Sequence, residues 1–238
     1  MELKFIGRGA AFNPKEFSNS AYFIEDNNLF LIDCGETVFR QLIVNNILEG
    51  IEEVYLMITH THSDHIGSIG SLASYLYYKM NKKLNIIIPS NPKKDKYLNY
   101  IINILEAFSC EDKYLFLKDN ELDNKFNSFN NIRYYETIHS NNLDCYCIVF
   151  DTKKGYIYYS GDSKETKVVE KLIKENKPIY KMYFDVSTSI EEDSPHLNIN
   201  KLAETIPEEL KTKVYCMHLD SDECIKIIEE LKLNLVNL

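Results

Sequence analysis

A cluster of metal-binding side chains behind a short apolar run limits what this chain can fold into more than any other feature. Residues 58–68 read ITHTHSDHIGS and contain three of the six histidines and an aspartate. Imidazole is the commonest metal ligand in proteins, and carboxylate oxygens suit divalent ions. The preceding run, VYLMIT at 54–59, is rich in strand formers. The pattern predicts a strand followed by a loop that points alternate side chains at one spot.

The number of potential ligands indicates more than one ion. Four fall within this loop: His60, His62, Asp64 and His65. That is too many for a single tetrahedral ion that keeps an open position, so two ions with ligands from elsewhere fit better. Three candidates follow other predicted strands: His139, Asp162 and His218. A lone histidine at a strand end is usually an ordinary surface residue, but three candidate ligands at strand ends, together with the loop, favour a shared metal centre.

Strands and helices are predicted to alternate along most of the chain. Strands are expected at 3–9, at 20–35 (two strands joined by a turn at Glu25–Asn28), and at 54–59, 84–89, 114–117, 132–139, 145–150, 155–162, 181–186 and 213–218. Helices are expected at 36–48, 69–80, 94–108, 167–175, 199–206 and 222–233. No repeat and no Pro/Gly/Ser-rich linker interrupts this order. The pattern predicts an α/β fold in which helices cover sheets, in one domain spanning residues 1–238.

Composition narrows the classes of partner. The net charge is −9, from 27 basic and 36 acidic residues, which disfavours binding to a long nucleic acid. A small anionic ligand is still compatible, because bound metal ions would reverse the local field. The first residues, MELKFIGRGAAF, have the pattern of neither a signal peptide nor a membrane anchor. We therefore expect a cytoplasmic protein with no membrane partner, and we expect its six scattered cysteines to be buried free thiols.

The order of these residues resembles the metal-binding series of the metallo-β-lactamase fold superfamily: H-x-H-x-D-H, then a histidine, an aspartate and a histidine. The resemblance implies an α/β, four-layer αβ/βα sandwich of two β-sheets flanked by helices. It also implies two zinc ions, although manganese or iron suit similar ligands. One ion would be held by His60, His62 and His139, and the other by Asp64, His65 and His218. Asp162 would bridge the two ions.

A narrower resemblance connects the chain with the ribonuclease Z branch of this superfamily. GRGAAF, NSAYF, IDCGETVFRQL and YSGDS are similar to motifs of that branch. Its H-E-A-T segment and later histidine correspond to FDVST and SPHLNINKLAE, so Asp185 stands for the glutamate and His196 for the histidine. Leu197 and Asn198 depart from the serine and threonine usual there. On spacing alone, His196 could equally be a solvated loop residue before a helix. The resemblance implies that His196 protonates the leaving oxygen while Asp185 fixes its tautomer and raises its pKa, and makes Asp64, His196 and Asp185 the expected catalytic residues.

The interval between His139 and Asp162 distinguishes the chain from tRNA-processing enzymes. Ribonuclease Z carries a long tRNA-gripping arm there, whereas this interval has room only for two strands and a turn. The chain is similar to the anti-Pycsar phosphodiesterases of phages and bacteria, which degrade cyclic mononucleotides and so counter immune signalling. That resemblance implies a homodimer in the cytoplasm of a bacterium or a phage-infected host. The alternatives are an RNA 3′-processing endonuclease, a hydrolase of thioesters or lactones, and a metal-binding module without catalysis.

Overall fold

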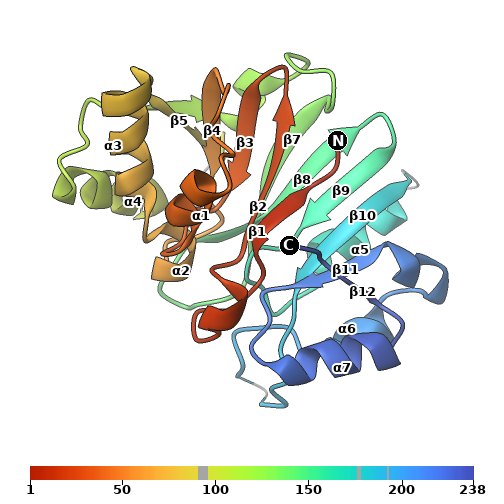
Figure 1. The fold of residues 1–238 in the computed structure, drawn as a ribbon. Helices are drawn as coiled ribbons and strands as arrows, with labels where there is room; N and C mark the ends of the chain where they lie inside the picture. The colour runs from red at the N-terminus through yellow and green to blue at the C-terminus, as the bar shows by residue number, and fades with distance from the viewer. Residues whose placement is uncertain (91–95, 176–177, 192) are drawn as a thin grey trace.

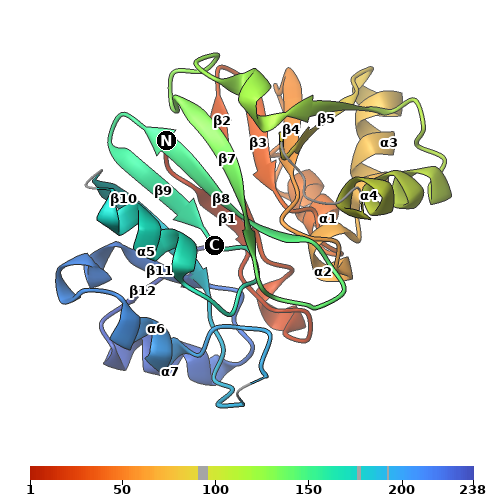
Figure 2. The ribbon, with the colours of Figure 1, turned by 180° about the vertical axis from the view of Figure 1, so that it is seen from behind.

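Two six-stranded β-sheets face each other, and helices cover both outer surfaces (Figures 1 and 2). The computed structural model describes residues 1–90, 96–175, 178–191 and 193–238. Within these ranges the layers run helix, sheet, sheet, helix. The α/β four-layer sandwich expected from the sequence is confirmed.

The first sheet has the strand order β1-β2-β3-β4-β5-β6. Its first three strands are antiparallel neighbours, and β3 through β6 run parallel to one another. The strands are β1 (Lys4–Gly7), β2 (Ser20–Glu25), β3 (Asn28–Ile32), β4 (Glu53–Met57), β5 (Leu84–Ile88) and β6 (Tyr114–Lys118). The predicted turn joins β2 to β3, where Asp26 and Asn27 both adopt positive φ angles of 49° and 62°. This conformation matches the twist of a hairpin, and Asp and Asn tolerate it.

The second sheet repeats this arrangement in the order β12-β11-β10-β9-β8-β7. Strands β7, β8 and β9 are antiparallel, and β9 through β12 are parallel. The strands are β7 (Asn131–Thr137), β8 (Cys145–Thr152), β9 (Gly155–Tyr159), β10 (Ile179–Asp185), β11 (Val214–Met217) and β12 (Asn234–Leu235). In both sheets the parallel strands place their carboxyl ends at the same edge, and the candidate residues follow those ends.

The helices connect the parallel strands. On the first sheet they are α1 (Val38–Val44), α2 (Ser63–Ile66), α3 (Ile69–Met80) and α4 (Lys96–Ala107). On the second they are α5 (Lys167–Lys174), α6 (Ile199–Thr205) and α7 (Asp222–Glu230). Short 3₁₀ turns lie at Pro14–Glu16, Asp119–Leu122 and Glu208–Lys213. None of the helices in the described part of the chain is long and apolar enough to cross a bilayer.

Three buried apolar clusters hold the layers together. One packs the first sheet against α1, α3 and α4, and a second packs the other sheet against α5, α6 and α7. The third lies between the sheets, where Phe23 stacks on Phe30 at 4.6 Å and meets Phe150 edge-on at 6.0 Å. Such aromatic pairs contribute about 0.5–1.5 kcal/mol beyond the area they bury.

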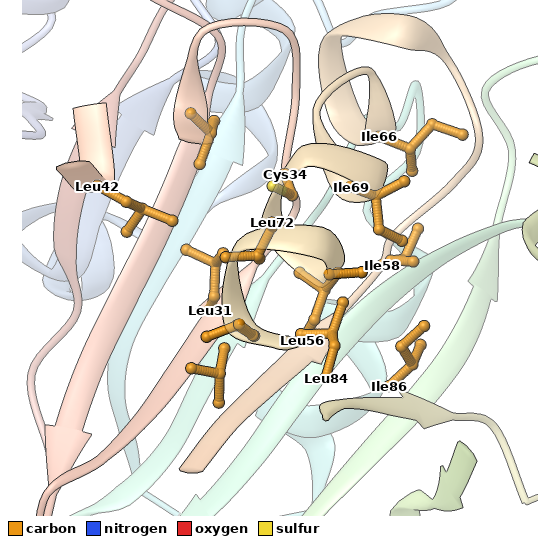
Figure 3. Close-up of a cluster of buried hydrophobic side chains, with 14 of the residues drawn as sticks. Leu31, Cys34, Leu42, Leu56, Ile58, Ile66, Ile69, Leu72, Leu84 and Ile86 are labelled. Carbon is orange, nitrogen blue, oxygen red and sulfur yellow. The ribbon is translucent and has the colours of Figure 1, made fainter. Parts of the chain in front are cut away.

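The first cluster also anchors the loop that carries the candidate metal ligands. Figure 3 shows Ile66 and Ile69, which come directly after the histidine-rich segment, packed with Leu72, Leu56 and Ile58 above the sheet. All five side chains are almost completely buried. Burying each aliphatic side chain of this size is worth about 1.5–3 kcal/mol, so the loop is held from its carboxyl side by the core.

Some boundaries differ from the sequence prediction. The stretch at 60–65 is not entirely a loop, because Ser63–Ile66 forms a helical turn, α2, directly before α3. The helix expected at 94–108 is described from Lys96, and residues 94 and 95 lie outside the described ranges. The short strand β12 follows the last helix and was not expected. All six cysteines are free and buried, as the sequence predicted.

Candidate metal centre and active site

The structure brings the nine candidate residues to one edge of the sandwich. The segments that carry them leave strand ends of both sheets, and strands of one direction place those ends side by side. His60 and His62 follow β4, Asp64 and His65 lie on α2, His139 follows β7, Asp162 follows β9, Asp185 ends β10, His196 precedes α6, and His218 follows β11. All nine belong to groups whose potential ligand atoms lie within 4.8 Å of one another.

The first group contains His60, His62, His139 and Asp162. His62 Nδ1 lies 2.9 Å from His60 Nε2 and 3.1 Å from His139 Nε2. The carboxylate of Asp162 is close to two of these rings, with Oδ2 at 3.8 Å from His60 Nε2 and 3.6 Å from His139 Nε2. Three ring nitrogens therefore converge beside one carboxylate.

The second group contains Asp64, His65, His218 and again Asp162. Asp64 Oδ2 lies 3.3 Å from both His65 Nε2 and His218 Nε2. Asp162 approaches the same two rings with different oxygens, Oδ1 at 3.3 Å from His65 and Oδ2 at 3.3 Å from His218. Asp162 is the residue common to both groups, and it is buried.

Hydrogen bonds behind the rings determine which nitrogen faces the cluster. His139 Nδ1 lies 3.0 Å from the carbonyl of Pro195, which can only accept, so Nδ1 carries the proton. His65 Nδ1 donates to Asp33 Oδ2 at 2.8 Å. Both rings therefore direct Nε2 at the cluster. Outer partners of this kind orient the histidine ligands of metal sites and fix their tautomer.

The unpaired atoms and the charges of the cluster fit bound cations. His65 Nε2 and Asp162 Oδ1 are buried and have no hydrogen-bond partner among the residues that the structure describes. Burial alone would lower the pKa of His65, but the carboxylates of Asp162, Asp33 and Asp64 raise that pKa well above its ordinary value. Buried carboxylates thus draw positive charge into the cluster. Imidazole nitrogens and carboxylates around such a spot are a donor set for divalent metal ions.

Two further residues of the cluster, His60 and Asp162, can bind a cation without first losing a proton. Burial lowers the pKa of His60 well below its ordinary value, so its ring is neutral. Burial would raise the pKa of Asp162, but the imidazoles of His218 and His65 outweigh it and hold that pKa well below its usual range. Metal ligands must be deprotonated, and these two already are.

Asp33 is a site residue that the sequence analysis missed. It follows β3, is fully buried, and accepts bonds from the backbone N–H of Thr59 at 2.7 Å and from the Thr59 hydroxyl at 2.8 Å, besides the bond from His65. It thereby ties the end of β4 to the ring of His65. The signal was present in the sequence, because Asp33 is a polar residue at a strand end like Asp162.

Backbone conformation at the site requires particular residues. Gly161, directly before Asp162, has φ of 57°, and an added Cβ would lie 2.7 Å from the carbonyl oxygen of Tyr146. Gly35 lies against the loop, where a Cβ would sit 1.8 Å from the carbonyl oxygen of Asp64. Asp33 and His218 also adopt positive φ angles, 62° and 55°. Such left-handed residues cost free energy and concentrate at functional sites.

His196 and Asp185 form a pair beside the two groups. His196 Nδ1 lies 3.0 Å from Asp185 Oδ2, and Asp185 also accepts bonds from the Ser163 backbone N–H at 3.1 Å and the Ser160 hydroxyl at 3.2 Å. Burial by itself would lower the pKa of His196, but the bond to Asp185 and the charge of Asp162 raise it to about 9. These ligand atoms also form a third group with Asp162 and His218. Because Nδ1 is bonded to Asp185, the atom of His196 that remains free is Nε2.

A pocket of about 570 Å³ opens onto this cluster. It is within the range of roughly 300–1,000 Å³ that is usual for small-molecule sites. Six of its lining residues come from the groups above: His62, Asp64, His139, Asp162, His196 and His218. The remaining walls include Phe12, Glu36, Ser140 and Asp193. The cluster is therefore open to solvent on one side, unlike a closed structural metal site.

The fold and this open cluster define a metal-dependent hydrolase of the metallo-β-lactamase fold. The metallo-β-lactamase fold protein YhfI from Bacillus subtilis superposes with a TM-score of 0.72 at 18% identity, over 98% of this chain and 95% of that one. A family model described as "Anti-Pycsar protein Apyc1" matches residues 1–237, and the chain belongs to this family.

Two relatives represent this family and the ribonuclease Z proteins. The Anti-Pycsar protein Apyc1 of Bacillus phage BSP38 is 26% identical over 234 residues, covering 91% of this chain and 88% of that protein. Ribonuclease Z of Methanococcus maripaludis is 33% identical over 131 residues, covering 50% of this chain and 42% of that protein. The family resemblance expected from the sequence motifs is confirmed.

Proposed function

We propose that this metal-dependent phosphodiesterase uses two zinc ions to hydrolyse the 3′,5′-cyclic mononucleotides of cytosine, uracil, adenine and guanine to linear monophosphates. The observation that carries the proposal is the position of Asp162, whose carboxylate belongs to two separate groups of ligand atoms. Membership of the anti-Pycsar family supports the choice of substrate.

The two groups divide the ligands in the proposal. His60, His62 and His139 would hold one ion; Asp64, His65 and His218 would hold the other, and Asp162 would contact both. When bound, such ions supply a nucleophile from water at neutral pH and neutralise phosphate charge. Manganese or iron would suit the same donors.

His196 would act as the general acid. With Nδ1 bonded to Asp185, it would present Nε2 to the pocket over the ligand groups, which His196 lines, and a pKa of about 9 keeps the ring protonated in the metal-free chain. Nε2–H would donate to the ester oxygen that leaves, and Asp185 would hold the ring in that orientation. A positioned acid of this kind contributes about 10²–10⁴-fold to rate.

The segment between His139 and Asp162 supports a small substrate. It is described completely and forms a loop followed by the β8–β9 hairpin, with no protruding arm. A chain with a net charge of −9 gains little from a long polyanion, whose binding depends on neutralising many phosphates. A single phosphate needs only the charge of the metal centre.

The test is a comparison of substrates with one metal-analysed preparation. We expect cyclic CMP, UMP, AMP and GMP to be opened to linear monophosphates, while a 3′-extended pre-tRNA remains uncut. His62→Ala serves as the matched control, because it removes a proposed ligand and should abolish the reaction. Intact cyclic nucleotides in the presence of two bound ions per chain would contradict the proposal.

RNA 3′-processing is the second candidate, favoured by the 33% identity to Ribonuclease Z over 131 residues. In that case the pre-tRNA would be trimmed efficiently and all four cyclic nucleotides would persist. The same incubation therefore separates the two functions.

We also propose that the chain acts as a homodimer, as the family resemblance implies. Sedimentation of the metal-loaded protein at working concentration should give twice 27.8 kDa. A monomer under the conditions of the activity assay would rule this out.

A further inference from the structure

Phe12 is a large apolar residue at the pocket that is almost completely exposed. It lines the pocket that opens onto the metal-binding groups, and its side chain is 98% exposed. Single exposed apolar residues are common on protein surfaces and by themselves mean little. The position of Phe12 is different, because the segment that carries it is held rigidly.

Backbone hydrogen bonds fix the turn that carries Phe12. The N–H of Asn13 donates to the carbonyl of Ala10 at 2.9 Å, which closes a tight turn with Phe12 near its tip. The N–H of Ala10 and the side-chain amide of Asn13 both donate to the carbonyl of Leu219, at 3.0 and 3.1 Å. Leu219 is the neighbour of His218, so the turn is attached directly to the metal-binding cluster.

The other residues that line the pocket indicate what kind of molecule the ring of Phe12 would contact. Histidine and aspartate ligands form one side of the pocket, while Glu36 and Asp193 add negative charge to its lining. Negative charge on the pocket wall from residues outside the ligand groups disfavours a second phosphate. A ligand with one phosphate and a flat apolar part fits this combination of metal centre, acidic wall and exposed ring.

We infer that Phe12 is a substrate-binding residue that stacks on the purine or pyrimidine base while the metal centre binds the phosphate. The inference rests on the proposed function and extends it to the base. Every base has a π-face, so stacking on a phenyl ring tolerates all four bases. A backbone turn that is fixed before binding loses little conformational entropy when the base arrives.

The chain contains no tryptophan, so Phe12→Trp introduces a single tryptophan, whose fluorescence can be excited selectively over that of the tyrosines. Stopped-flow mixing of the metal-loaded variant with cyclic AMP should quench its fluorescence in a saturable way before appreciable turnover. Ribose 3′,5′-cyclic phosphate, which keeps the phosphate and sugar but lacks the base, should leave it unchanged. Tyr78→Trp is the control, because Tyr78 is 70% exposed on α3 and is not part of the pocket wall. It should respond to neither compound.

Kinetics provide the second measurement. Phe12→Ala should raise the KM for each cyclic nucleotide about tenfold with little change in kcat, toward the lower end of what alanine substitution removes from a base–aromatic stack. Phe12→Tyr should restore the KM, and the base-free substrate should be hydrolysed equally by all three proteins. A tenfold loss corresponds to ~1.4 kcal/mol.

The outcomes separate this inference from the proposed function. Quenching by nucleotides without any hydrolysis would sustain the stacking and refute the phosphodiesterase proposal. Hydrolysis without quenching, or an equal KM effect on the base-free substrate, would overturn the stacking. A Phe12→Ala protein that changes only its sedimentation would also overturn it, and would indicate that Phe12 contacts a second copy of the chain.

Discussion

The two halves of the molecule share one topology but contribute to the site in different ways. In each half three antiparallel strands lead into three further parallel ones, so β3 corresponds to β9 and β4 to β10 (Figure 1). The first half supplies four candidate ligands from one segment of six residues, after β4. The second half supplies its residues one or two at a time from the ends of β7, β9, β10 and β11. The first half of the molecule therefore carries a compact motif and is the compact half of the site. The second half carries its residues on separate segments and is the dispersed half.

The corresponding aspartates show what this difference means. Asp33 follows β3 and Asp162 follows β9, and both are buried. Asp33 lies behind the cluster and bonds Thr59 and His65, whereas Asp162 lies inside it between the two ligand groups. In the compact half the aspartate supports candidate ligands that are already close together in the sequence. In the dispersed half it joins candidate ligands that the chain brings from distant positions.

The largest effect is expected from removing the aspartate of the dispersed half. Asp162→Ala should lose both metal ions and all measurable hydrolysis together, because both ligand groups share this carboxylate. Metal analysis by mass spectrometry beside an activity assay checks this. The matched control is Asp222→Ala, an exposed aspartate on α7, which should keep two ions per chain. Full activity of Asp162→Ala with one bound ion per chain would contradict the assignment of two ions.

His196→Ala should give the next largest effect, a loss of about 10²–10⁴-fold in rate with both ions retained. The defect should shrink on nitrophenyl phosphodiesters, because nitrophenolate leaves without needing a proton. Steady-state assays on cyclic AMP and on the nitrophenyl ester provide the comparison. An equal defect on both substrates would indicate that His196 binds substrate or metal instead.

Asp33→Asn tests the supporting role in the compact half. We expect metal affinity or activity to fall about 10–100-fold, as is typical when the partner of a ligating histidine is altered. The full complement of ions should return at high zinc concentration, in contrast to Asp162→Ala. Competition with a chromogenic chelator measures the affinity, and wild-type affinity would show that the bond to His65 is dispensable.

The smallest effect is expected for Asp185→Asn. The amide keeps an acceptor for His196 but removes the charge that strengthens the bond. A hydrogen bond to a charged group is worth about 1.4 kcal/mol more than a neutral one, so the rate should fall about tenfold. Metal content should stay at two ions. A loss as large as that of His196→Ala would mean that Asp185 does more than orient the ring.

The sequence predicted the compact half of the site better than the supports behind it. The strand before His60 and the helix at 69–80 were expected and are present. The helical turn α2 was missed, because a four-residue segment with a single apolar residue, Ile66, is too short to show a helical periodicity. Asp33 was missed for a different reason: one aspartate after a strand is indistinguishable from a surface residue until its burial is known.

In the dispersed half the strand-end positions identified His139, Asp162 and His218 as candidates, but His196 and Asp185 were assigned only through the family resemblance. Spacing alone left His196 equally compatible with a solvated loop residue. The structure places its ring 3.0 Å from a buried carboxylate and against the pocket, which a sequence cannot express. The sequence likewise did not identify Phe12 as a candidate site residue, since an apolar residue beside a strand is normally assigned to the core.

By itself the sequence determined the types of candidate metal ligand, the layered α/β class and the absence of room for an arm between His139 and Asp162. Those properties follow from local patterns of apolar and metal-binding residues, which act over a few positions. Only the tertiary structure decided that Asp162 joins both ligand groups, that Asp33 lies behind His65, and that the turn carrying Phe12 is attached beside His218. These contacts join residues far apart in the chain, and they arise because two sheets packed face to face bring their strand ends to a common edge.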